Sequence, residues 1–228
     1  HGQQNVIIVD DLASVTDDFD VLIDFTHPES TMAHLKPAGE HHKAMVIGTT
    51  GFSEEQLSEV KDLAKDIPCV LSPNMSVGVN LLFKIAGEVA KVLGDDYDME
   101  IVEAHHRHKK DAPSGTAKKL GEILAAARGQ NPEEVTVYGR RGMTGERPKE
   151  SIGIHAVRGG EIIGDHSVIF AGPAERIELI HRAQSRDSFA LGAIRATRFV
   201  AGALPGLYSM QDVLKKEQKN LRLKPNFQ

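Results

Sequence analysis

A dense run of cationic and proton-exchanging side chains lies near the middle of the chain. Residues 105–110 read His-His-Arg-His-Lys-Lys, and residues 111–116 continue as Asp-Ala-Pro-Ser-Gly-Thr. Histidine titrates near neutral pH, and a lysine crowded by cations, such as Lys109, should have a lowered pKa and release its proton more readily. These residue types predict proton transfer on an anionic ligand.

The segment after this run has the pattern of a helix start. Residues 116–128 form an amphipathic helical pattern. The first amides of a helix lack intrahelical partners and lie at the positive end of its dipole. Gly115 lets a ligand approach the backbone closely, and Thr116 adds a hydroxyl, so we expect a carboxylate or phosphate pocket here.

Two other interpretations of the basic run compete with this one. Its three histidines have the chemistry of zinc ligands, but the neighbouring cations would repel a metal, no cysteine is nearby, and Glu103 is the only acidic residue just upstream. A solvated charged loop is the usual explanation for a basic run. The adjoining Pro-Ser-Gly-Thr sequence argues against such a loop, and we predict no metal site.

Composition sets the broad class of protein. The 228 residues carry a formal net charge of -5, with 40% hydrophobic and 26% charged residues, as in ordinary globular proteins. An acidic chain gives no general reason to expect nucleic acid as a partner. No apolar stretch is long enough to span a membrane, and no signal peptide is visible. Cys69 stands alone, which suits a reducing compartment, so we expect a cytoplasmic location.

The first third of the chain alternates strand and helix patterns. Short apolar runs predict strands buried on both faces of a parallel sheet, and the segments between them predict helices, with Pro37 expected to end or kink the first. The expected strands are 6–9, 21–25, 45–47 and 69–71, and the expected helices are 28–40 and 53–65. This order predicts an α/β fold with a partial Rossmann-like, doubly wound parallel sheet.

The second half has a different pattern. A long helix should begin at Ser76 and end at Gly94, and several strands joined by short turns predict a mixed, largely antiparallel sheet in a second domain. The expected strands are 99–104, 135–138, 152–157, 162–171 and 177–181, with a last helix at 189–204. We expect the polar tail, residues 215–228, to be loosely ordered.

Small and hydroxyl residues follow three of the predicted parallel strands, at 25–28, 48–51 and 72–75. Each loop alone fits an ordinary turn. Ligands of doubly wound sheets bind at the carboxyl ends of the strands, so three such loops together favour a nucleotide-type site. The usual G-x-G-x-x-G pattern is absent, and the Gly-rich residues 139–145 have the wrong spacing.

The stretch Glu103-Ala-His-His-Arg-His-Lys109, followed by Asp111-Ala-Pro-Ser-Gly-Thr-Ala117, resembles the signature of the bacterial dihydrodipicolinate reductase family. Residues 21–26, 46–52, 72–80, 158–160, 164–166 and 181–193 also read as family segments. The resemblance extends from about residue 20 to residue 214. It implies an NADH- or NADPH-dependent reductase of lysine and diaminopimelate biosynthesis, acting on a small cyclic dicarboxylate.

The family's architecture and site residues carry over as expectations. The resemblance implies a nucleotide-binding domain (1–76), an α+β substrate-binding and tetramerisation domain (77–185), a return to the first domain (186–228), and a homotetramer. It implies that His105 donates or accepts a proton and that Lys109 donates one. His106, Gly115 and Thr116 would bind the substrate carboxylates. The expected cofactor residues are Gly48, Thr49, Thr50, Ser72, Pro73, Asn74, Met75 and, as an addition, Arg186.

The sequence also departs from the family pattern. Family members begin with a strand and a GxxGRMG loop that this sequence lacks, so the resemblance implies that about fifty residues of this kind precede His1. We therefore expect a fragment that binds the cofactor weakly or not at all. A non-catalytic dicarboxylate-binding relative is the alternative. The extension 215–228 has no assigned role.

Overall fold

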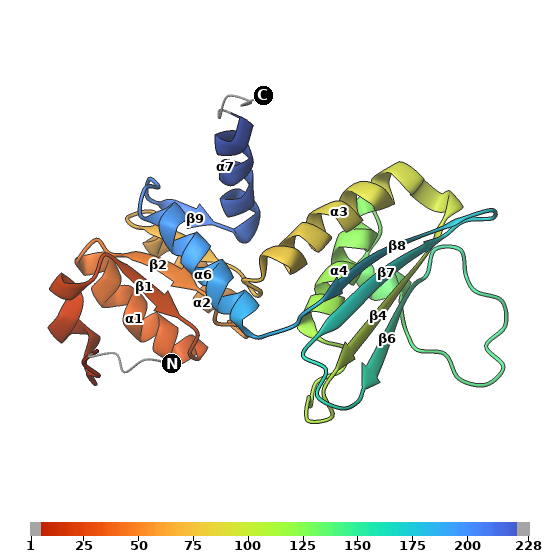
Figure 1. Ribbon diagram of the computed structural model, residues 1–228, viewed down its shortest axis with the longest axis horizontal. Helices are drawn as coiled ribbons and strands as arrows, with labels where there is room; N and C mark the ends of the chain where they lie inside the picture. Colours follow the sequence, from red (N-terminus) through yellow and green to blue (C-terminus); the bar gives the residue numbers. More distant parts are fainter. Residues whose placement is uncertain (1–5, 223–228) are drawn as a thin grey trace. The chain divides into compact units, whose positions relative to one another are not determined.

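The structure is a computed structural model that describes the backbone of residues 6–222 and the side chains of residues 6–216. The chain forms two compact units, which we describe separately. The first contains the residues up to Met75 together with those from Leu191 onward, and the second contains Ser76–Ala190. Figure 1 shows the first unit in red, orange and blue, and the second from yellow to blue-green.

The first unit is built on a four-stranded sheet in which every pairing is parallel. Its strands lie in the order β1 (Val21–Asp24), β2 (Ala44–Ile47), β3 (Pro68–Leu71) and β9 (Gly206–Tyr208). The registers Asp24↔Ile47 and Ile47↔Leu71 bring the carboxyl ends of β1, β2 and β3 to one edge of the sheet. The predicted parallel α/β sheet is confirmed.

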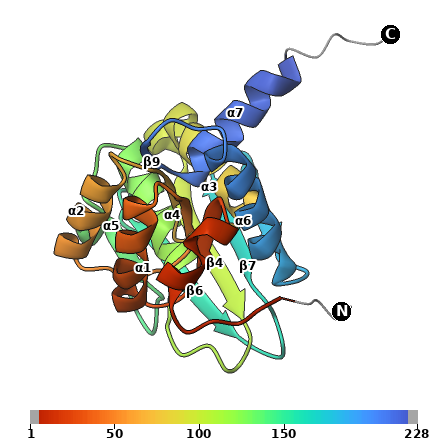
Figure 2. The ribbon, with the colours of Figure 1, turned by 90° about the vertical axis from the view of Figure 1, so that its left-hand side faces the viewer.

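Two helices connect these strands and enclose an apolar core. They are α1 (Pro28–Glu40) and α2 (Glu54–Leu63), which lie beside each other in Figure 2. Side chains of both helices pack with β2 and β3 in one buried cluster. The predicted capping box at Ser53 is present, since its hydroxyl accepts from the Gln56 amide (3.2 Å) and the Gln56 side chain accepts from the Ser53 amide (2.9 Å). Pro37 does not end α1, which continues to Glu40.

The second unit contains a five-stranded sheet in the order β5-β6-β4-β7-β8. The strands are β4 (Asp98–His105), β5 (Thr136–Tyr138), β6 (Ile152–Arg158), β7 (Asp165–Ala171) and β8 (Arg176–Arg182). Only the β4–β7 and β7–β8 pairs are antiparallel, whereas β5–β6 and β4–β6 are parallel. The sheet is mixed as predicted, and its parallel pairs arise where a helical crossover joins β4 to β5 and β6.

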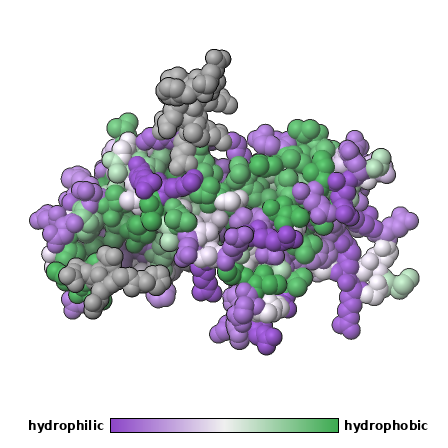
Figure 3. Space-filling model, in the orientation of Figure 1, coloured by the Kyte–Doolittle hydropathy of each residue, from purple (hydrophilic) through white to green (hydrophobic). Residues whose placement is uncertain are grey.

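The core of this unit lies between the sheet and two helices that contact each other, α3 (Val77–Leu93) and α4 (Gly115–Ala127). Ser76 caps α3, and Gly94 follows it with φ of 58°, so both predicted ends are confirmed. Leu81, Ile85 and Val92 of α3 remain exposed, and green apolar residues are visible on the surface over this helix in Figure 3. The short helices are α5 (Pro132–Val135), η1 (Leu12–Asp18) and η2 (Gly94–Asp96).

Three predicted segments need correction. Residues 6–9 form no strand: their side chains are exposed, and none of the strands of this sheet pairs with them. The predicted helix 189–204 is α6 (Asp187–Val200). Residues 215–222, predicted to be loosely ordered, continue α7 (Met210–Arg222), and residues 223–228 lie outside the described residues. None of the helices within the described residues is long and apolar enough to cross a membrane.

Candidate active site

His105 is the last residue of β4 and lies almost completely inside the second unit, with 9% of its surface exposed. Alternate residues of a strand point to the same face of a sheet, so His105 shares the core-facing side of β4 with Glu103. The His105 Nδ1 atom lies 2.6 Å from the Glu103 Oε2 atom. The strand therefore provides an imidazole paired with a buried carboxylate.

Glu103 is fully buried and accepts four hydrogen bonds. Its Oε2 accepts from His105 and from Arg158 Nη1 (2.8 Å), and its Oε1 accepts from Arg158 Nη2 (2.8 Å) and from the Ser114 amide (3.0 Å). Burial raises the pKa of a carboxyl, but the hydrogen bonds from Arg158, His105 and Ser114 outweigh it and hold the pKa of Glu103 below its usual range. Glu103 is therefore ionised at neutral pH.

Sheet register explains why these side chains meet. His105 is the partner of Arg158 on the parallel strand β6, and Glu103 is the partner of His166 on the antiparallel strand β7. Four chemically active side chains therefore gather at one end of the sheet. The i, i+2 spacing of Glu103 and His105 could have predicted their pairing, but the roles of Arg158 and His166 depended on register.

Lys109 lies in the turn after β4 and forms an ion pair with Asp111 (Nζ to Oδ1, 2.8 Å). This hydrogen bond lowers the pKa of Asp111. Arg158 donates in turn to the main-chain oxygen of Asp111 (2.8 Å). The sequence places cations beside Lys109, whereas the structure gives it an anionic partner, Asp111.

The predicted helix start is present at α4. Ser114 is its N-cap, and its hydroxyl accepts from the Ala117 amide (3.2 Å). Gly115 is the first helical residue and is exposed, and no atom lies within 4 Å of the position of an added Cβ. Thr116 is half-buried beside it. The helix N-terminus is therefore open to an anionic ligand at Gly115.

His106 follows His105 and is half-buried, with its ring centroid 6.2 Å from that of the exposed His108. Its main-chain oxygen accepts from the Lys109 amide (3.1 Å), which makes the turn that carries Lys109. His105, His106, Lys109, Gly115 and Thr116 thus all belong to the second unit, on β4, the following loop and the start of α4.

His166 is a functional candidate that sequence reasoning did not single out. Its Nε2 lies 3.1 Å from the Ser114 hydroxyl, and its ring meets that of His105 edge to face at a centroid distance of 5.2 Å. Burial, followed by the electrostatic effect of His105, lowers the pKa of His166 to about 4. His166 is therefore a neutral imidazole at pH 7 that supports the helix cap.

The strand ends of the first unit gather around another buried carboxylate, Asp24. Its Oδ1 accepts from the amide and hydroxyl of Thr26 (2.9 and 2.6 Å), and its Oδ2 lies 2.9 Å from His34 Nδ1. Burial opposes ionisation, but the hydrogen bonds from Thr26 and His34 leave the pKa of Asp24 lowered. The Thr49 hydroxyl is 3.4 Å from the same carboxylate, so Asp24 joins the loops after β1 and β2.

The predicted cofactor residues of the β2 loop differ in exposure. Thr49 is buried and accepts from the Thr31 hydroxyl (2.8 Å), whereas Thr50 is exposed. An added Cβ at Gly48 would lie 2.3 Å from the Phe25 ring, so a larger residue there would displace this exposed ring. Gly51 has φ of +88°, a left-handed conformation that suits glycine, and the space beside it is open.

The β3 loop carries four more of the predicted cofactor residues. The Ser72 hydroxyl donates to the main-chain oxygen of Asn74 (2.8 Å), Pro73 is exposed, and Met75 is fully buried. The eight residues fall in different units: those up to Met75 belong to the first, and Arg186 is an exposed residue of the second, just before α6. The loops after the adjoining parallel strands thus offer exposed residues and hydroxyl groups. Such loops commonly bind nucleotide cofactors.

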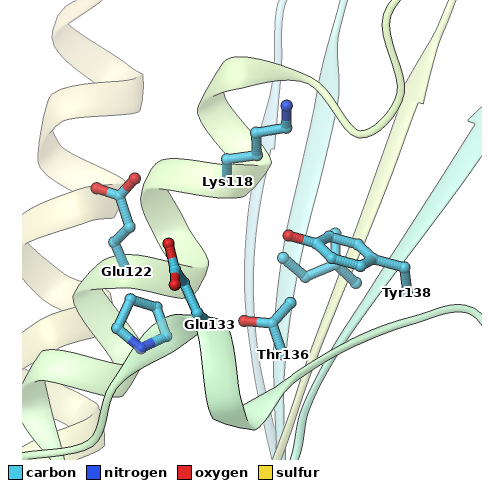
Figure 4. A pocket seen from close by; sticks show the side chains of 7 residues that line it. Lys118, Glu122, Glu133, Thr136 and Tyr138 are labelled. Carbon is cyan, nitrogen blue, oxygen red and sulfur yellow. The ribbon is translucent and has the colours of Figure 1, made fainter.

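A separate pocket of about 250 Å³ lies on the second unit, between α4, α5 and the strands β5 and β6. Figure 4 shows Lys118 and Glu122 on its helical side and Tyr138 on its strand side. None of the predicted site residues lines it. Glu122 is also paired with the exposed Lys119, at 2.8 Å. Among the described residues, no group of three or more acidic, histidine or cysteine side chains is arranged to hold a metal ion.

A parallel nucleotide-type sheet in one unit, with acid–base side chains and an open helix start in the other, is typical of two-domain nucleotide-dependent oxidoreductases. Comparison with known proteins gives the family. Residues 1–75 match the model of the dihydrodipicolinate reductase N-terminus, and residues 78–214 match that of its C-terminus. The chain belongs to the dihydrodipicolinate reductase family and is a pyridine-nucleotide-dependent oxidoreductase.

Relatives and a solved structure agree with this assignment. The chain is 57% identical to the 4-hydroxy-tetrahydrodipicolinate reductase of Hahella chejuensis, over 93% of this chain and 80% of the relative. It is 58% identical to the enzyme of that name from Syntrophobacter fumaroxidans, over 89% and 76%. The structure of dipicolinate-bound dihydrodipicolinate reductase from Paenisporosarcina sp. TG-14 is similar, with a TM-score of 0.71 and 30% identity over 87% of this chain and 76% of that one.

Proposed function

We infer that this chain reduces 4-hydroxy-2,3,4,5-tetrahydrodipicolinate to tetrahydrodipicolinate with loss of water, in lysine and diaminopimelate biosynthesis. One observation carries the inference: the His105 imidazole and the start of α4 are bound to the same buried carboxylate, Glu103, at 2.6 and 3.0 Å. Through Glu103, a proton-exchanging imidazole is linked to a helix N-terminus that can bind an anion. This arrangement suits acid–base chemistry on a carboxylate-bearing substrate. The names of the relatives agree with this substrate.

The start of α4 is the proposed site for the substrate carboxylates. Gly115 leaves room for an anion beside the first amides of the helix, and Thr116 and His106 add side-chain donors. The similar solved structure is described as bound to dipicolinate, which is a cyclic dicarboxylate. We therefore assign His106, Gly115 and Thr116 to carboxylate binding.

His105 and Lys109 are the proposed proton donors. Reduction of the cyclic imine with loss of its hydroxyl as water consumes one hydride and one proton. The hydride attacks the ring, electron density moves onto the neighbouring carbon and nitrogen, and an acid must protonate the product. Both side chains lie on the loop that begins at the end of β4, next to the proposed carboxylate site.

When bound, NADH or NADPH supplies the hydride. We assign its binding to the strand-end residues Gly48, Thr49, Thr50, Ser72, Pro73, Asn74 and Met75, with Arg186 as an additional contact. The adjoining parallel ends of β2 and β3 and the exposure of Thr50 and Pro73 support this assignment. Asp24 supports the loops by its hydrogen bonds to Thr26 and Thr49.

We also propose that the protein is cytoplasmic and that its domain boundaries lie near residues 76 and 186. In addition, we propose that it forms a homotetramer. The sheet face of the second unit that points away from its core carries exposed apolar side chains, including Val157 and Ile180. Such a face suits contact with other copies of the chain. Light scattering of the purified protein measures its mass directly, and a monomer at micromolar concentration would contradict the tetramer.

The function is tested by following NADH and NADPH oxidation by the purified protein with freshly generated substrate. Calorimetric titration with pyridine-2,6-dicarboxylate measures the dicarboxylate site separately. We expect oxidation that requires the substrate, with pyridine-2,6-dicarboxylate as an inhibitor. Binding of this dicarboxylate without oxidation of either cofactor would instead identify a non-catalytic dicarboxylate-binding relative.

A further inference from the structure

We propose that Glu103 is a positioning residue, which holds His105 in one tautomer and fixes the start of α4 at the same time. The proposal deepens the function inferred above and rests on it, because that function gives His105 the proton transfer. It adds a role for a residue that touches neither substrate nor cofactor.

The contact between the two side chains determines the tautomer. An ionised carboxylate only accepts hydrogen bonds, so the His105 Nδ1 atom, 2.6 Å from Glu103 Oε2, must carry a proton. The proton exchanged with a ligand is then carried by Nε2. The same logic applies to acid–base histidines whose second nitrogen is held by a carboxylate.

Glu103 itself cannot reach a ligand. It is 0% exposed, and its two oxygens accept four hydrogen bonds, from His105, Ser114 and both terminal nitrogens of Arg158. Four bonds use the acceptor capacity of a carboxylate. Any effect of Glu103 on the reaction must therefore pass through the groups that it binds.

The second set of contacts extends from Glu103 to the proposed second proton donor. The Arg158 Nη2 atom that donates to Glu103 also donates to the main-chain oxygen of Asp111, and the Asp111 carboxylate binds Lys109 at 2.8 Å. The amide of Ser114 is bound directly. Glu103 thus secures the loop between His105 and α4 at both ends and, through Arg158, near its centre.

The same strand supplies a matched control. Glu100 accepts hydrogen bonds from two arginines, Arg140 and Arg147, and its Oε2 lies 2.7 Å from the Nε2 of His155. It lies on the other face of the sheet, because odd and even residues of β4 alternate. Glu100→Gln therefore also removes a carboxylate from an arginine–histidine network, but it leaves His105 and α4 untouched.

The direct test is nitrogen NMR of the ¹⁵N-histidine-labelled protein, with the His105 signals assigned from a His105→Gln sample. At a pH where the ring is neutral, the wild type should show a protonated Nδ1 and an unprotonated Nε2. Glu103→Gln should give a mixture of tautomers, whereas Glu100→Gln should match the wild type. Because Glu103→Gln leaves the Arg158 charge unpaired, the double variant Glu103→Gln/Arg158→Met serves as a second sample.

Kinetics and binding test the consequences. In Glu103→Gln we expect kcat to fall by about 10- to 100-fold, the usual effect of removing a group that orients a functional histidine. Affinity for pyridine-2,6-dicarboxylate should also fall, since a glutamine has one acceptor oxygen where Glu103 uses two, one for His105 and one for the Ser114 amide. Glu100→Gln should keep both values within twofold of the wild type.

The outcomes separate this proposal from the proposed function. If folded Glu103→Gln and double-variant proteins keep the wild-type His105 signals and kcat, the positioning role is wrong, even though the enzyme is active. If the wild type has no reductase activity but the His105 tautomer still depends on Glu103, the proposed function fails and the positioning of the imidazole stands.

Discussion

The Nε2 atom of His166 lies 3.1 Å from the hydroxyl of Ser114, which caps α4, and both side chains are buried. A neutral imidazole can accept a hydrogen bond from this hydroxyl. Protonating the ring would cost free energy, because the buried imidazolium would be shielded from water. The start of α4, where we propose that carboxylates bind, therefore depends on a histidine that must stay uncharged.

Acid should destabilise the protein through His166. Its pKa is about 4 in the folded state and near 6.5 when unfolded, so the unfolded state binds more protons between these values and stability falls as pH falls. The cost from pH 7 to pH 5 is about 2 kcal/mol. His166→Gln should lose this part of the pH dependence, as measured by urea unfolding at both pH values.

The exposed His27 is the control for this experiment. His27→Gln should keep the wild-type dependence between pH 7 and pH 5. An unchanged slope in folded His166→Gln would show that His166 is not a source of the acid sensitivity.

Loss of either proposed proton donor should reduce turnover. His105→Gln and Lys109→Met should each lower kcat by about 10²- to 10⁴-fold, the usual contribution of general acid–base groups. Binding of NADH or NADPH, followed by fluorescence, should be retained. The exposed neighbours give matched variants, Lys110→Met and His108→Gln, which should remain active. Full turnover in both His105→Gln and Lys109→Met would contradict the assigned roles.

Gly115→Ala tests ligand approach to the helix start without disturbing the fold. No atom of the protein lies within 4 Å of the new Cβ, so thermal stability should be unchanged or slightly raised. A methyl group there would crowd a bound carboxylate, and we expect the Kd for pyridine-2,6-dicarboxylate to rise about 10-fold, a loss of about 1.4 kcal/mol. Gly39→Ala, in the first unit, is the comparison and should bind normally. If Gly115→Ala and Gly39→Ala bound pyridine-2,6-dicarboxylate with equal affinity, the assignment of the carboxylate site to Gly115 would be wrong.

Asp24 should support the cofactor loops and not the dicarboxylate site. Asp24→Asn weakens the buried contacts to Thr26 and His34, and we expect a stability loss of about 1–3 kcal/mol. The Kd of NADH or NADPH should rise, whereas pyridine-2,6-dicarboxylate titration should be unaffected. The surface carboxylate Asp62, paired with the exposed Lys65, gives the control Asp62→Asn. If Asp24→Asn weakened dicarboxylate binding but not cofactor binding, the assignment of Asp24 to the cofactor loops would be wrong.

Much of the fold was readable from local patterns. The strands at 21–25, 45–47 and 69–71, the capping box at Ser53 and the two ends of α3 all depend on a few neighbouring residues, and the structure confirms them. Segments whose state depends on distant partners were less predictable. Residues 6–9 have a strand-like composition but pair with no strand of the sheet, and β9 and α7 were missed because their patterns are short or polar.

For the site, the sequence by itself determined the chemistry available: a run of histidines and lysines followed by a helix start, in a pattern specific enough to indicate the family. Only the tertiary structure decided how these groups are held. Register in the mixed sheet brings Arg158 and His166 to Glu103 and His105 from strands that are more than fifty residues away. Burial then fixes which groups stay charged, because a carboxylate deprived of water remains ionised only when donors surround it, as four of them surround Glu103.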